Sequence, residues 1–109
     1  MAFNKLVYEY HDSTLESCQF GPRRELNLQI LLDPVWNPQA PQRVTLHFTA
    51  IENFDEVREF FKEVQLHRQT EESIDGILAC VNNGKGKWLI ELERNGSVAI
   101  VTFKKPCEG

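Results

Sequence analysis

Apolar and polar residues alternate along most of this chain, in short runs separated by polar breaks. The clearest run is 43–50, and its apolar positions are predicted to face a core: Val44, Leu46, Phe48 and Ala50. Alternation with a period of two is typical of a strand that has one face on the core and one in solvent. The same pattern predicts strands over 5–10, 14–20 and 25–32. Gly-Pro-Arg-Arg at 21–24 supplies turn residues, so 14–20 and 25–32 are expected to form a hairpin.

The spacing changes from strand to helix at Asn53. Apolar residues then recur every three or four positions: Phe54, Val57, Phe60, Phe61 and Val64. Such a stripe predicts an amphipathic helix that runs to about Gln65 and packs on a sheet. Asn53 is expected to cap the helix through its side-chain oxygen, with Glu56 three residues further on. His67 is expected at the solvated end of this helix.

Three more strands are predicted after the helix, over 74–81, 87–93 and 98–104. Residues 82–86 have the composition of a hairpin loop, and the Asn-Gly pair at 95–96 predicts a two-residue type I′ turn. The last run is apolar on both faces. We therefore expect it to be a central strand, or a strand packed between the helix and a partner.

The order of these elements predicts one domain over residues 1–109. Strands, one helix and further strands indicate an α+β fold, with a single, mainly antiparallel sheet of five to six strands and one amphipathic helix packed on a face. A parallel crossover between 43–50 and 74–81 fits this order, and the order of the strands in the sheet is left open. The proline-rich segment 33–42 is predicted to be a loop, because proline cannot donate a hydrogen bond to a neighbouring strand.

Charge and composition narrow the classes of partner. The net charge is −4, and residues 52–75 hold eight acidic against three basic residues, which disfavours nucleic-acid binding. No apolar run approaches the ~20 residues of a membrane span, and the first residues lack the pattern of a signal peptide. Cys18 and Cys80 are expected in or near the core and Cys107 on the surface, all as free thiols. These features favour a cytoplasmic protein.

No catalytic, cofactor-binding or metal-binding residue is predicted. His11, Asp12 and Ser13 are the residue types of a catalytic triad, but adjacent residues cannot adopt its geometry. Their hydrogen-bonding groups are better suited to shaping the start of a strand. A metal site would have to combine His11, Asp12, Glu16 and His47, and none of the usual metal-binding spacings occurs.

Four residues stand out as candidate contacts: His11, Asp12, Trp36 and His47. Trp36 lies within the proline-rich loop, where a tryptophan can anchor a protein contact. The alternative, which we favour, is that Trp36 folds back over the open face of the sheet.

One part of the sequence resembles a known group of proteins. The segment Tyr10–Phe20, followed by Glu25–Ile30, resembles the opening of small, uncharacterised bacterial α+β proteins, in which a His-Asp-Ser or His-Asp-Ala turn leads into a strand pair. Some of those proteins are similar to immunity proteins of bacterial toxin systems. The resemblance implies a family of unknown function and no catalytic residues.

Three hypotheses of function follow from these observations. The first is a non-enzymatic interaction module whose partner is a protein, either a second copy in a homo-oligomer or another chain, as for an immunity protein. The second is a small-ligand binder with a pocket between the sheet and the Phe54 and Phe61 side of the helix. The third, and less favoured, is an enzyme that uses His11, Asp12 or His47. No nucleic acid, membrane or cofactor is expected to take part.

Overall fold

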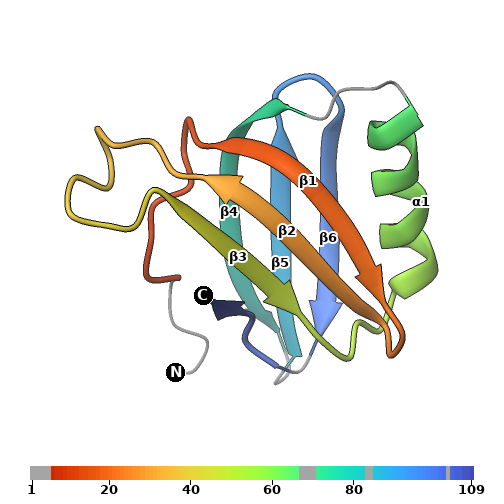
Figure 1. Ribbon diagram of the computed structural model, residues 1–109. Helices are drawn as coiled ribbons and strands as arrows, with labels where there is room; N and C mark the ends of the chain where they lie inside the picture. The colour runs from red at the N-terminus through yellow and green to blue at the C-terminus, as the bar shows by residue number, and fades with distance from the viewer. Residues whose placement is uncertain (1–5, 67–70, 83–84, 103) are drawn as a thin grey trace.

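The computed structural model describes residues 6–66, 71–82, 85–102 and 104–109, and these form one antiparallel sheet with one helix (Figure 1). The elements are β1 (Thr14–Gly21), β2 (Glu25–Leu31), β3 (Arg43–Phe48), α1 (Phe54–Leu66), β4 (Glu72–Asn82), β5 (Lys85–Leu92), β6 (Gly96–Thr102) and β7 (Cys107–Glu108). The predicted α+β class is confirmed. The sheet has seven strands where five to six were predicted, because the chain returns after β6 to add β7 beside β3.

The strand order is β6-β5-β4-β1-β2-β3-β7. β1 and β4 join the two halves of the sheet through only two residue pairs, Thr14 with Ser73 and Leu15 with Glu72. Figure 1 shows β1, β2 and β3 crossing in front of β4, β5 and β6, with α1 along one side. The parallel crossover that the order of elements allowed does not occur: β3 and β4 are not neighbours, and β4 pairs antiparallel with β1.

The core lies between the two halves of the folded sheet and the apolar face of α1. The predicted alternation in β2 is confirmed, since Leu26, Leu28 and Ile30 are fully buried. The helix contributes Val57, Phe61 and Val64 as predicted, while Phe54 and Phe60 are partly buried against the core. The other half of the sheet contributes Ile74, Trp88, Ile90 and Ile100. Fully burying each such side chain stabilises the fold by about 1.5–3 kcal/mol.

Other predicted details need correction. Residues 6–10, the described part of the predicted first strand, form no strand. Ala50 is exposed and left-handed (φ 52°), because β3 ends at Phe48 and the chain turns toward the helix.

The predicted hairpin loops also differ. The turn between β5 and β6 has three residues, since Leu92 pairs with Gly96, whose φ of 84° is the left-handed conformation that glycine allows. Asn95 does not share that conformation, so the turn is not type I′. Asn82 pairs with Lys85, which shortens the predicted 82–86 loop to two residues that lie outside the described residues.

β6 lies at one edge of the sheet, not at its centre. Its outer edge is covered by the segment that enters α1. Ile51 bridges to Thr102, and the Glu52 N–H donates to the Val101 carbonyl at 2.7 Å. The Asn53 side chain continues this pairing: its Oδ1 accepts from the Val101 N–H at 3.0 Å, and its Nδ2 donates to the Ala99 carbonyl at 2.7 Å. The side-chain oxygen that was predicted to cap α1 thus pairs with β6 as a neighbouring strand would.

The opposite end of the sheet is covered as well. β7 pairs with β3 at Leu46 and His47, and Gly109 exchanges two backbone hydrogen bonds with Thr45, at 2.7 and 3.0 Å. Cys18 is buried and Cys107 is exposed, as predicted. The side chain of Cys80 and all of His67 lie outside the described residues. None of the described helical residues belongs to a helix long and apolar enough to cross a membrane.

Candidate functional site

The most distinctive surface feature is the free edge of β4. β4 pairs with β5 from Ile74 to Asn82, but on its other side it pairs with β1 only at Glu72 and Ser73. The backbone of Ile74 adds two bonds on that side, to Asp12 at 2.9 Å and Ser13 at 2.8 Å. Within the described ranges, no strand pairs with the stretch from Asp75 to Asn82 on that side. From Gly76 to Asn82 the backbone therefore has no strand partner on that side among the described residues, and such an edge can be extended by another chain.

A groove of about 310 Å³ runs beside this edge. One wall is the irregular segment 6–10, and the other is formed by β4 and β5. Its lining residues are Leu6, Tyr8, Glu9, Tyr10, Ile77, Leu78, Ala79 and Trp88. Leu78 is 50% exposed and is one of the residues that line the groove. The described lining of the groove is thus mostly apolar and includes one carboxylate, that of Glu9. The groove lies away from the Phe54 and Phe61 side of the helix, where a pocket was considered.

The wall formed by 6–10 is held in place by Glu108 of β7. The carboxylate accepts hydrogen bonds from the Val7 N–H at 2.7 Å, the Tyr8 N–H at 3.1 Å and the Tyr10 hydroxyl at 2.7 Å. Tyr10 is buried, and burial raises the pKa of its phenol, with a further contribution from Glu108. The N-terminal wall of the groove therefore depends on a side chain near the C-terminus.

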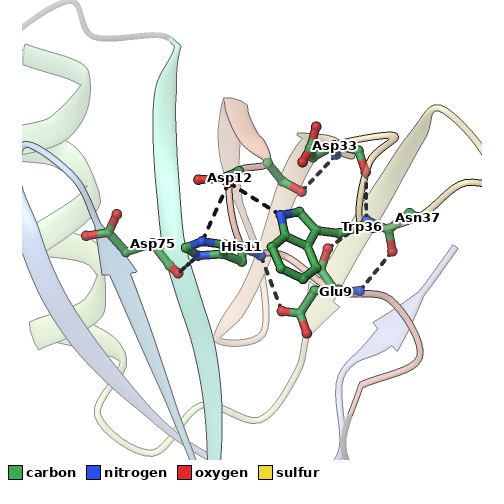
Figure 2. Close-up of polar contacts among 8 residues, drawn as sticks. Glu9, His11, Asp12, Asp33, Trp36, Asn37 and Asp75 are labelled. Carbon is green, nitrogen blue, oxygen red and sulfur yellow. Dashed lines mark hydrogen bonds and ion pairs between the residues drawn. The ribbon is translucent and has the colours of Figure 1, made fainter.

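Three of the four candidate residues meet at the end of the edge that adjoins Asp75 (Figure 2). His11 Nδ1 lies 2.8 Å from the Asp75 carbonyl oxygen, and His11 Nε2 lies 3.5 Å from Asp12 Oδ2. Trp36 packs edge-on against the His11 ring, with centroids 5.5 Å apart, and its Nε1 donates to Asp12 Oδ2 at 3.4 Å. The hydrogen bond to the Asp75 carbonyl is the main reason that the pKa of His11 is raised, and Asp12 adds to it.

The proline-rich loop reaches this position through a residue that the sequence did not single out. Asn37 Oδ1 accepts from the Glu9 N–H at 2.9 Å, while Asn37 Nδ2 donates to the Glu9 carbonyl at 2.8 Å. Buried Ser13 adds a second link, since its hydroxyl accepts from the Asp33 N–H at 3.1 Å. Trp36 therefore packs against residues 9–13, and it is 50% exposed. The favoured prediction, that Trp36 folds over the open face of the sheet, is wrong.

The fourth candidate lies elsewhere. His47 belongs to β3, where it pairs with Asn27 and Cys107, and its Nε2 is 3.9 Å from Glu25 Oε1. Glu16, the remaining member of the metal set considered, binds Arg43 at 2.9 Å. Across the part of the chain that the structure describes, no three His, Cys, Asp or Glu side chains are grouped to hold a metal ion. The candidate site thus combines an open strand edge, an apolar groove and a Trp–His–carboxylate cluster.

Comparison with models of protein families, with curated proteins and with solved structures gave no match for this chain. Its function is therefore inferred from the geometry described above.

Proposed function

We propose that the protein is a non-enzymatic interaction module that binds an extended segment of another polypeptide along the free edge of β4. The observation that carries the proposal is the contrast among the edges of the sheet. The β6 edge is covered by residues 51–53, and the β3 edge by β7 and Gly109. The edge from Asp75 to Asn82 has no such cover among the described residues.

An exposed strand edge binds an extended peptide through main-chain hydrogen bonds, and neighbouring pockets select its side chains. The β4 edge has both components. Its backbone supplies the ladder, and the groove beside Ile77 and Ala79 can take apolar side chains from every second position of a bound strand. Half-exposed Leu78 and Trp36 add apolar surface at the lip and at one end.

The resemblance to immunity proteins suggests a bacterial toxin as the kind of partner, bound in the cytoplasm. We include this in the proposal because the free edge, like the resemblance, points to recognition of a protein and not to chemistry on a substrate. An enzyme using His11, Asp12 or His47 is less favoured, since His47 lies with Glu25 on another part of the sheet and does not join the other two.

A small-ligand binder remains the second candidate, and the groove is the observation that favours it. Its volume of about 310 Å³ is at the lower end of the range for ligand pockets, and its lining is mostly apolar. A small ligand would need the groove but not the backbone groups of β4. The two candidates therefore differ in whether binding protects β4 amides from hydrogen exchange.

A photo-crosslinking amino acid placed at position 78 tests the proposal in cells. The matched control carries the same amino acid at Glu59, an exposed position on α1. Position 78 is expected to crosslink a discrete protein, and position 59 is not. If the two positions capture the same background, or if position 78 captures nothing, the β4 edge is not the interaction site.

A further inference from the structure

We infer that the segment bound at the β4 edge carries a lysine or arginine at the end beside Glu9, Asp12 and Asp75. This inference rests on the proposed function and specifies the chemistry of the partner. It follows from the distribution of charge around the groove.

Glu9 is the one charged residue in the described lining of the groove, and it lies toward the end of the edge that adjoins Asp75. The exposed carboxylate of Asp12 lies close by, beside the His11 and Trp36 rings, while Asp75 faces His11 with its carbonyl and its exposed side chain points away from the ring. Among the residues that the structure describes, no lysine or arginine lines the groove. An extended chain laid along β4 therefore meets apolar surface over Ile77 to Ala79 and negative charge at its end, which complements a cation there.

Trp36 gives a second reason to expect a basic side chain in the bound segment. Its ring is half exposed and lies next to Asp12, to which its Nε1 donates. The free part of an indole ring attracts the ammonium of lysine or the guanidinium of arginine, and arginine can also stack on it. One basic side chain could therefore contact both the aromatic ring and the carboxylates.

The same charge pattern disfavours a second copy of this chain as the occupant. β4 reads ESIDGILACVN and contains no lysine or arginine. A second β4 would bring its own exposed Asp75 to the interface and no cation for Glu9 and Asp12. The segment 6–10 flanks the edge as well, so the groove suits a single extended chain better than the edge of another sheet.

The experiment selects a phage-displayed library of random octapeptides against the full chain. The enriched peptides are then synthesised, and their binding is measured by fluorescence polarisation and by backbone amide shifts. Two double variants with the same net charge are compared with the natural chain. Glu9→Gln with Asp12→Asn removes charge at the site, and Asp55→Asn with Glu59→Gln removes charge on the exposed face of α1. Asparagine tolerates the left-handed φ of 65° at position 12.

The enriched peptides are expected to share a lysine or arginine at one fixed position and to shift the amides of 75–79. Affinity should fall at least tenfold in the Glu9→Gln, Asp12→Asn variant and remain within twofold in the α1 variant. Replacing the basic residue of the peptide by glutamine should cause a similar loss. This peptide swap tests the inference even if the double variant folds poorly.

Three results would overturn the inference. Peptides that shift β4 amides without a basic preference refute the cation but leave strand binding intact. Peptides that shift no β4 amides, or a library that yields no binder, refute the proposed function itself. A dimer in light scattering that Leu78→Lys converts to a monomer would assign the edge to a second copy.

Discussion

Glu108 offers the clearest test of how the groove is held together. Its carboxylate accepts hydrogen bonds from Val7, Tyr8 and Tyr10, across about 100 residues of sequence. Glu108→Gln keeps one oxygen acceptor and turns an NH₂ group toward a donor. Glu108→Ala removes all three bonds and leaves the buried Tyr10 hydroxyl without this acceptor.

The expected magnitudes follow from these contacts. A hydrogen bond to a charged group contributes about 1.5–3 kcal/mol net when buried, and less in solvent. Glutamine retains the two bonds made at the Oε2 position and loses the exposed one from Val7, so Glu108→Gln should lower the free energy of unfolding by about 1–2 kcal/mol. Glu108→Ala also loses the two part-buried bonds, from the Tyr8 N–H and the Tyr10 hydroxyl, and should lower the free energy of unfolding by about 3–4 kcal/mol.

Urea denaturation gives the two free-energy changes, and amide hydrogen exchange locates them. Exchange should accelerate at the Val7 and Tyr8 amides but not in the middle of α1, because these two amides donate to the Glu108 carboxylate. Glu59→Gln, an exposed change on α1, should be neutral to within about 0.5 kcal/mol. If both Glu108 variants match the natural chain in stability and exchange, the carboxylate does not hold the wall of the groove.

Three further predictions concern single side chains. Because the pKa of Tyr10 is raised in the folded state, its contribution to stability is complete below about pH 10, the ordinary phenol value, and is lost as the pH rises above it. Urea denaturation should show this loss of stability at alkaline pH in the natural chain and not in Tyr10→Phe. Equal losses in the two proteins would contradict the role given to Tyr10. Asn53→Asp places an oxygen against the Ala99 carbonyl and should lower the free energy of unfolding, measured by thermal denaturation, by about 1–3 kcal/mol. An unchanged midpoint would mean that water replaces the lost bond. In an NMR titration the pKa of His11 should lie above 6.5. Asp12→Asn should lower this pKa only partly, because the hydrogen bond to the Asp75 carbonyl is the larger cause of the shift. A pKa at or below 6.5 in the natural chain would refute this geometry.

The local periodicity of the sequence was enough to predict the main elements. Alternation identified β2, β3, β5 and β6, and the spacing from Phe54 to Val64 identified α1, because these patterns reflect which face of each element is buried. The two-residue β7 has no periodicity of its own. Leu6, Val7 and Tyr8 resemble a strand, yet they are held by the Glu108 side chain and not by a backbone ladder.

The candidate site was predicted only in part, for a related reason. His11, Asp12 and Trp36 were named from their residue types, and the structure brings these three together. Asn37 and Glu108 were missed, because their partners lie 28 and about 100 residues away and no local signal marks such contacts. The open edge of β4 depends on the order of strands in the sheet, which alternation alone does not determine.

Amide hydrogen exchange along β4, measured with and without a selected peptide, tests the central claim most directly. In the free protein, every second amide between Ile77 and Asn82 should exchange fast, since it points away from β5, while its neighbours exchange slowly. The bound peptide should slow the fast set and leave β6 unchanged. Uniformly slow exchange along free β4, or protection by the peptide only at other strands, would contradict an open edge that binds an extended chain.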